Sequence, residues 1–290
     1  VALYIEMELL SYCPTGFGSQ QPRFHLLIRA VFLLTYLVNL AGNSMLVGLV
    51  WADPQLHSPM YFFLSQLAVL DMGLVCITLP QALVHALTQH RAIPFARCMA
   101  QLFIYLSVST MEGCLLAALC LKIVAASWAV VIPHALLHSV MTARLRYCSN
   151  RLPHYFCHLQ SLLRLSCTRP FVNELVLFTE ATLVVGTPCA IILASYVCIG
   201  VAVGRLRSAQ ALRKALSTCG SHLTVVLLTY GTVAWLYFHP DSSNTPGQKQ
   251  QVTFFYTSVV PTLNPLIYSL RNKDVAAALR RVKRKVLAQC

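Results

Sequence analysis

The chain has 290 residues, of which 57% are hydrophobic and 11% are charged, and its mean hydropathy is +0.64. An ordinary soluble domain carries about a quarter charged residues, so this composition argues against a very apolar soluble bundle. The apolar residues form blocks of about 20 residues, the length that crosses a bilayer. We therefore expect an all-α integral membrane protein.

The formal net charge of +13 is compatible with nucleic-acid binding, but its distribution is not. Basic residues are concentrated directly after the last apolar block: Arg280, Arg281, Lys283, Arg284 and Lys285. Basic residues in that place hold a membrane protein in its orientation and contact anionic lipid. We expect membrane lipid as a partner, and no nucleic acid.

The predicted elements follow from the apolar blocks, within one domain that spans residues 1–290. An N-terminal segment, residues 1–23, shows no signal-peptide pattern, and the chain contains no Asn-x-Ser/Thr glycosylation acceptor. The transmembrane bundle occupies residues 24–270. Its expected spans are residues 26–50 and 59–83, a long block at 98–142, and residues 175–203, 216–238 and 252–270. Polar loops are expected at 143–171, 205–214 and 239–251, and a basic amphipathic tail at 271–290.

The third apolar block is abnormal, because Glu112 and Lys122 are its only charged residues from Cys98 to Thr142. A single helix of that length would reach about 65 Å, twice the bilayer core. Two spans barely fit, with their turn near Lys122, where no residue that favours a turn is present. The block is therefore either two tightly joined helices or one fused crossing.

The twelve cysteines include no Cys-x-x-Cys pair. Those inside apolar blocks are expected to behave as small hydrophobic residues. Cys98, Cys148, Cys157 and Cys167 lie at block edges or in the long polar loop, where they are typical of disulfides if the loop faces the secretory lumen. A zinc site is the alternative, although the spacing suits no common finger.

No enzyme signature is present: there is no nucleophile elbow, no helical pair of zinc histidines and no glycine-rich phosphate loop. A small-molecule transporter is a further alternative, but neither inverted repeats nor paired broken helices are evident. An Asn-Pro pair does interrupt the last span at Asn264 and Pro265. Proline removes a backbone donor there, so the break indicates a hinge or a polar site within a bundle.

Five segments, in order, resemble the olfactory receptor branch of the rhodopsin-like (class A) G-protein-coupled receptors. They are Gly42-Asn43; Leu56-His-Ser-Pro-Met-Tyr-Phe-Phe-Leu-Ser65; Leu67-Ala68 with Asp71; Lys214-Ala-Leu-Ser-Thr-Cys-Gly-Ser-His-Leu223; and Pro261-Thr-Leu-Asn-Pro-Leu-Ile-Tyr-Ser-Leu-Arg-Asn-Lys-Asp-Val275. One such motif alone would be weak, whereas five over most of the chain are very specific.

The resemblance implies a bundle of seven helices with an outside N-terminus, in the plasma membrane. It implies detection of a small hydrophobic odorant and coupling to a heterotrimeric G protein of the olfactory, stimulatory type. It also implies two disulfides, Cys98–Cys157 and Cys148–Cys167. The missing glycosylation acceptor departs from the family pattern.

Odorant contacts are implied on three helices, and ordinary helix packing is the alternative for each residue. On the third helix, Tyr105, Leu106, Ser109 and Thr110 share one face by their spacing. Glu180 could select amine or hydroxyl ligands, or face the lipid headgroups. The facing residues implied on the fifth and sixth helices are Val184, Tyr230, Val233, Ala234 and Tyr237.

Two carboxylates lie inside apolar helices, where such groups are costly and usually functional. The resemblance assigns Asp71 and Glu112 to a sodium pocket, together with Asn43 and Asn264. The alternative is that both carboxyls are protonated groups that only donate and accept structural hydrogen bonds. No other metal or cofactor is expected.

The resemblance assigns an activation switch to Pro265, Tyr268 and Tyr196. In the family, the tyrosine at position 268 works opposite an arginine in an Asp-Arg-Tyr motif at the inner end of the third helix. That motif is missing here, and Ile123 occupies the arginine's place. We interpret this as a deletion from the end of the third helix to the start of the fourth, which puts G-protein coupling in question.

The deletion leaves the topology open between two forms. In a seven-span form, lysines and arginines are divided almost evenly between the two sides of the membrane, which is a poor orientation signal. A six-span form with fused third and fourth helices gives a stronger bias, but it leaves Cys98 in the cytoplasm. The alternative function is therefore a non-signalling receptor remnant retained in the endoplasmic reticulum.

Overall fold

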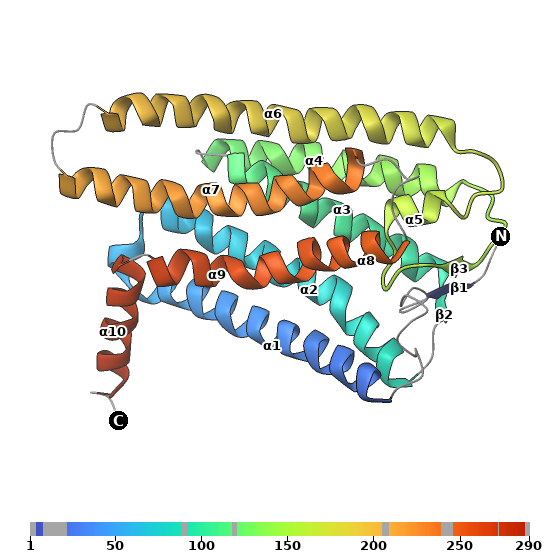
Figure 1. Cartoon of the computed structure of the whole chain (residues 1–290), viewed down its shortest axis with the longest axis horizontal. Coiled ribbons are helices and arrows are strands. Elements are labelled where there is room, and N and C mark those ends of the chain that lie inside the picture. Colours follow the sequence, from blue (N-terminus) through green and yellow to red (C-terminus); the bar gives the residue numbers. More distant parts are fainter. Residues whose placement is uncertain are drawn as a thin grey trace.

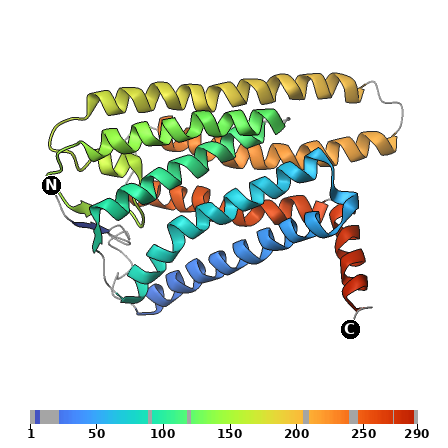
Figure 2. The same cartoon turned by 180° about the vertical axis from the view of Figure 1, so that it is seen from behind.

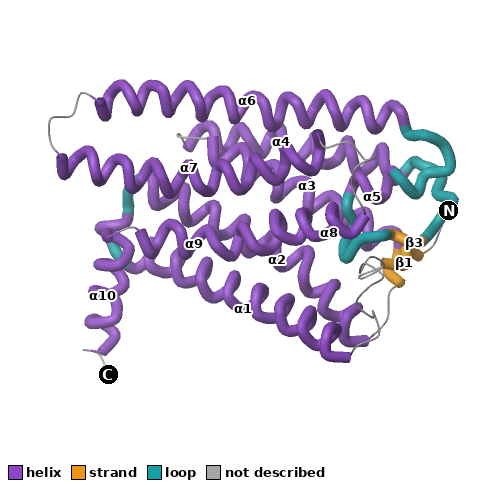
Figure 3. The backbone as a smooth tube through the Cα atoms, viewed as in Figure 1, coloured by secondary structure: helices purple, strands orange, loops and turns teal. Residues whose placement is uncertain are grey.

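The computed structural model describes residues 4–7, 22–88, 92–117, 121–204, 209–238, 246–271 and 273–287. Long helices run side by side along one axis, and loops gather at one end (Figures 1 and 3). The long helices are α1 (Pro22–Ala52), α2 (Pro59–Thr88), α3 (Phe95–Ala117), α4 (Leu121–Ala143), α6 (Phe171–Gly204), α7 (Ala209–Phe238) and α9 (Val260–Arg271).

Shorter elements complete the fold. They are η1 (Pro54–Leu56), α5 (Leu159–Leu163), α8 (Pro246–Phe254), the π-helical turn η3 (Phe255–Val259) and α10 (Lys273–Leu287), with three strands, β1 (Tyr4–Met7), β2 (Ala92–Pro94) and β3 (Arg151–Leu152). Elements α8, η3 and α9 follow one another as a single interrupted helical column (Figure 1). The predicted all-α fold class is confirmed, because the three strands are only 4, 3 and 2 residues long.

The apolar surface of the bundle indicates the membrane-facing side. Leu183, Leu193 and Val197 on α6 are each about two-thirds exposed (65%, 68% and 67%), which would be unfavourable in water. Among the described residues, four helical segments are long and apolar enough to cross a membrane: Leu26–Ala52, Pro59–Thr88, Phe95–Leu115 and Ala126–Ala143. Shorter apolar stretches occupy Cys189–Cys198 of α6 and Leu223–Leu236 of α7.

The long apolar block forms two helices, so the fused crossing of the six-span form is wrong. Helix α3 ends at Ala117, α4 begins at Leu121, and the two pack against each other (Figure 2). A fused helix could not bury its apolar residues in this way, whereas two paired helices can. Residues 118–120, at the junction, lie outside the described residues.

Several predicted boundaries shift in the structure. Helix α7 already begins at Ala209, so part of the basic segment predicted as a loop at 205–214 is helical. Likewise, α8 begins at Pro246, within the loop predicted at 239–251. Residues 205–208 and 239–245 lie outside the described residues. Both shifts have the same cause, because polar residues readily extend a helix beyond its apolar segment.

One end of the bundle is closed by the loop between α4 and α6 and by a small sheet. Strand β1 pairs antiparallel with β2 and parallel with β3, giving the order β2-β1-β3. Ile5 and Met7 of β1 are buried in the same apolar cluster as Leu152, Tyr155 and Phe156 of the loop. This cluster fixes the N-terminal strand over the end of the bundle.

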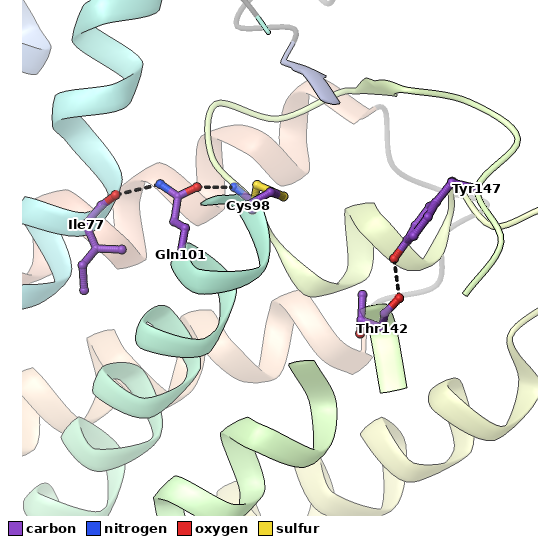
Figure 4. Close-up of a disulfide and its surroundings, with 6 residues drawn as sticks. Ile77, Cys98, Gln101, Thr142 and Tyr147 are labelled. Atoms are coloured by element: carbon purple, nitrogen blue, oxygen red, sulfur yellow. Dashed lines mark hydrogen bonds between the residues drawn. A yellow bond between two sulfur atoms is a disulfide. The ribbon is translucent and has the colours of Figure 1, made fainter. Parts of the chain in front are cut away.

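Both predicted disulfides are present at this end. Cys98, at the start of α3, joins Cys157, and Cys148 joins Cys167 within the loop. Gln101 accepts a hydrogen bond from the Cys157 backbone N–H (3.0 Å) and donates its amide to the Ile77 carbonyl of α2 (2.8 Å; Figure 4). Gln101 and the Cys98–Cys157 bridge thus hold the loop to α2 and α3.

The opposite end is closed by α10, which lies across the bundle rather than along it (Figure 1). Val275 and Ala278 of α10 are buried against α1, η1 and α2. The Arg281 guanidinium donates from Nε (2.9 Å) and from Nη2 (2.5 Å) to one oxygen of Asp53. The Asp53 side chain is 7% exposed and that of Arg281 is 32% exposed, so the carboxylate is shielded from solvent and the guanidinium only partly.

We expect the substitution Arg281→Gln to lower the stability of the bundle by about 1–2 kcal/mol, because it removes this guanidinium from the buried Asp53 carboxylate. The measurement is the thermal unfolding midpoint of the purified chain in detergent. Arg284→Gln is the matched control, since Arg284 is exposed on the same helix. Equal midpoints for the two variants would contradict a stabilising role for this ion pair.

Candidate functional site

A polar cluster lies in the middle of the bundle, between α1, α2, α3 and α9. The Asn264 amide donates a hydrogen bond to Asp71 Oδ2 (2.9 Å), which joins α9 to α2. The Asn43 amide donates to the Asn39 carbonyl (3.1 Å) and to the Pro261 carbonyl (3.2 Å), which joins α1 to α9. These bonds connect three helices through side chains that were predicted from the family motifs.

The cluster also contains oxygens that no described residue satisfies. Asp71, Asn43, Asn264 and Glu112 are all at most 1% exposed. Each has one buried oxygen without a hydrogen-bond partner among the described residues: Asn43 Oδ1, Asp71 Oδ1, Glu112 Oε1 and Asn264 Oδ1. Buried polar atoms are rarely left unpaired, so these oxygens need a partner such as water or a cation. A set made of carboxylate and amide oxygens suits a hard cation.

Helix α1 approaches the proline of the Asn-Pro pair closely. A Cβ atom at Gly42 would lie 3.1 Å from Pro265 Cγ, closer than ordinary van der Waals contact. A methyl group at position 42 would therefore have to push the proline ring away by a few tenths of an ångström. The small side of Gly42 lets α1 come close to α9. The next residue, Asn43, can then reach the Pro261 carbonyl of α9 with its side-chain amide.

The other residues of the predicted switch are less fully described. Tyr196 is half-buried and packs against an apolar cluster that includes Val225 and Val226. Tyr268 belongs to α9, but its side chain lies outside the described residues. Ile123 belongs to α4, and its side chain also lies outside them. The switch therefore stays a prediction.

The predicted odorant contacts on α3 lie beneath the closing loop. The Tyr105 ring is 4.9 Å from the Phe156 ring and 5.9 Å from the His158 ring, measured between centroids. Leu106 is buried in the same cluster. Ser109 and Thr110, about one turn further along α3, are half-buried.

Of the predicted odorant contacts on α7 whose side chains the structure describes, one forms a hydrogen bond to α3. The Tyr230 hydroxyl donates a hydrogen bond to the Gly113 carbonyl of α3 (2.8 Å), so this tyrosine links the two helices. Val233 and Ala234 are half-buried further along α7. The side chains of Tyr237 on α7 and Val184 on α6 lie outside the described residues.

Glu180 is the predicted site residue with the least expected neighbours. Its carboxylate contacts His134 and His138, both on α4. Neither histidine was predicted from the sequence. Polar residues four positions apart in an apolar helix would have been the available signal, because they share one helix face.

His154 and His158 form a second histidine pair, in the loop that closes the bundle. Their rings are stacked, with centroids 5.2 Å apart. Burial lowers the pKa of His158 to about 4, with Arg164 and Lys249 adding repulsion. Burial also lowers the pKa of His154, and the neighbouring His158 opposes its protonation further. Both side chains are therefore neutral at physiological pH, as their enclosed position requires.

A small pocket opens beside these histidines, where the loop meets α7 and α8. Its volume is about 30 Å³, and its lining includes His154, His158, Leu236 and Thr253. That volume holds about one water molecule. It is therefore far smaller than a typical ligand pocket of roughly 300–1,000 Å³.

These features define a helical, multi-pass membrane protein with a buried polar centre. The olfactory receptor family profile matches the chain in two parts, residues 32–129 and residues 119–287. The two parts overlap at residues 119–129, which include the start of α4.

Individual relatives agree with this family match. Olfactory receptor 1E16 of Mus musculus is 40% identical, over 91% of this chain and 92% of that protein. Olfactory receptor 2G3 of Homo sapiens is 39% identical, over 96% of this chain and 97% of that protein. Olfactory receptor 1f45 of Rattus norvegicus is 40% identical, over 91% of this chain and 92% of that protein. The chain belongs to the olfactory receptor family.

We expect Gly42→Ala to destabilise the bundle by about 1–3 kcal/mol, because the added methyl group must displace the Pro265 ring. Gly48→Ala is the matched control on the same helix, since a Cβ there meets nothing within 4 Å. Alanine at that position is expected to be neutral or stabilising by up to about 1 kcal/mol. The measurement is the thermal unfolding midpoint of both variants in detergent, which should fall for Gly42→Ala and stay equal or rise for Gly48→Ala. An unchanged midpoint for Gly42→Ala would contradict the close contact.

Proposed function

We propose that the chain detects small hydrophobic, volatile ligands within the upper half of its helical bundle. The observation that carries the proposal is the family match over both halves of the chain. The predicted contacts on α3 lie under a disulfide-linked loop, which supports a ligand site shielded from water. Tyr105 and Tyr230 would supply polar groups on otherwise apolar walls, a composition that suits small apolar ligands.

The proposed output is activation of a heterotrimeric G protein of the olfactory, stimulatory type, weakened by the missing inner segment. Only residues 118–120 separate the end of α3 from the start of α4. The Asp-Arg-Tyr motif that the family uses at this point is missing, and Ile123 stands in the arginine's place. Tyr268 and Tyr196 would then move on activation without their usual arginine partner.

The polar cluster is proposed to hold a sodium ion. Asn43, Asp71, Glu112 and Asn264 each present a buried oxygen without a partner among the described residues. Two carboxylates close together in an apolar bundle repel each other, and a monovalent cation between them would offset that cost. The ion would supply charge neutralisation, and the four side chains would hold it between α1, α2, α3 and α9.

The proposed location is the plasma membrane. A second candidate function is a non-signalling receptor remnant that is retained in the endoplasmic reticulum. The observation that favours it is the same short connection between α3 and α4, which leaves no second inner loop for a G protein to contact. The two candidates differ in surface expression and in the response to ligand.

Insertion of an olfactory-type second inner loop with its Asp-Arg-Tyr motif, between Ala117 and Leu121, tests the proposed output. We expect odorant-evoked cyclic AMP in transfected cells to rise by about tenfold over the parent chain, because the tyrosine switch regains its arginine partner. An insertion with the arginine replaced by alanine is the matched control. Surface labelling of tags at both termini distinguishes a chain that reaches the surface without coupling from one that is retained. A chain with the inserted loop that reaches the surface and gives no response to an odorant panel would contradict the receptor function.

The sodium site predicts a sodium-dependent stability that disappears in Asp71→Asn. Sodium chloride should raise the thermal midpoint of the purified parent chain by several degrees relative to choline chloride at equal ionic strength, because the ion binds only the folded state. In the variant, the two salts should give equal midpoints. Asp53→Asn, at the inner end of the bundle, is the control and should keep the difference between the salts.

A further inference from the structure

A compact group of three ionisable side chains joins α4 to α6, away from the Asp71 cluster. His134 and His138 lie one turn apart on α4 and face Glu180 on α6. His134 Nε2 lies 3.1 Å from Glu180 Oε2, and His138 Nε2 contacts the same oxygen. The two imidazole rings are inclined at 74°, with centroids 4.9 Å apart. Both Nε2 atoms therefore converge on one carboxylate.

The surroundings of the group are apolar. The His138 side chain is 2% exposed, that of His134 is 17% exposed and that of Glu180 is 24% exposed. The neighbouring Leu136 and Leu137 on α4 are 53% and 45% exposed and belong to its lipid-facing surface. Three ionisable groups within membrane helices are expensive, and such groups usually mark a functional site.

The three ligand atoms have the spacing of a metal site. They all lie within 4.8 Å of one another. In a tetrahedral zinc site with bonds of about 2.0–2.1 Å, ligand atoms are roughly 3.3 Å apart. Small rotamer changes therefore suffice to close the group around an ion. The buried Nδ1 of His134 has no hydrogen-bond partner among the described residues, so this ring is held only through its Nε2 side.

We infer that His134, His138 and Glu180 bind a divalent transition-metal ion such as zinc, which links α4 to α6. Two imidazoles and one carboxylate form a ligand set that zinc uses with a water in the fourth position. Imidazole ligands favour zinc and copper over sodium, magnesium and calcium, which prefer oxygen. The chemistry thus differs from that of the oxygen cluster around Asp71.

Metal binding requires both imidazoles to be neutral and the carboxylate to be ionised, because these forms donate the electron pairs that hold the ion. The bound ion neutralises the carboxylate and fixes both rings, which ties the outer half of α4 to α6. Helix α4 gains an anchor in this way that does not depend on its short connection to α3.

The test uses the purified full-length chain in detergent, treated with EDTA and then dialysed. We expect micromolar zinc to raise the thermal midpoint by about 3–6 °C, because the ion binds only the folded chain. Magnesium at the same concentration should have no effect. His138→Gln is the informative variant: glutamine can still donate a hydrogen bond to Glu180, but it is a poor zinc ligand. It should therefore lose the zinc shift while it keeps a folded state.

His85→Gln is the matched control, because His85 is a buried histidine on α2 outside the group. It should retain the full zinc shift. Cobalt provides a second readout on the parent chain: bound to the three groups, it should give the intense visible absorption of a tetrahedral site, and zinc should remove that absorption. An unchanged zinc shift in His138→Gln, or cobalt that remains six-coordinate in the parent chain, would overturn the inference. A purely structural His–Glu hydrogen bond would give both results.

Discussion

The hydrogen bond from the Asn264 amide to Asp71 is the interaction on which the arrangement of the helices depends. In the apolar interior no bulk water can pair with a carboxylate or a broken backbone, so these groups must find protein partners. Asp71 on α2 therefore pairs with Asn264, the residue before the proline that interrupts α9. Asn43 adds a second link, from α1 to the Pro261 carbonyl of α9.

The positions of other residues follow from this link. Helix α1 passes the Pro265 ring closely, and glycine at position 42 permits this approach without displacing the ring. The two ends of the bundle are then closed by different means. The Cys98–Cys157 bridge and Gln101 hold the loop at one end, and the Arg281–Asp53 ion pair holds α10 at the other.

Much of the fold could be predicted from the sequence, because apolar length and family motifs are local signals. The spans were predicted from apolar length. Both disulfides and the proximity of Asp71 to Asn264 were predicted from the family motifs. The fused form of the third and fourth helices was wrong, since charge counting does not include the apolar area that α3 and α4 bury against each other. The helix starts at Ala209 and Pro246 were also missed, because polar residues can extend a helix without an apolar signal.

The sequence by itself determined the family, the membrane-spanning composition and the missing Asp-Arg-Tyr segment, because each is a property of residues adjacent in the chain. Only the tertiary structure decided that Glu180 meets His134 and His138, and that His154 stacks on His158 inside the closing loop. Glu180 is 42 residues from His138 along the chain. A contact over that separation depends on how α4 and α6 are rotated against each other, and helix packing sets that rotation.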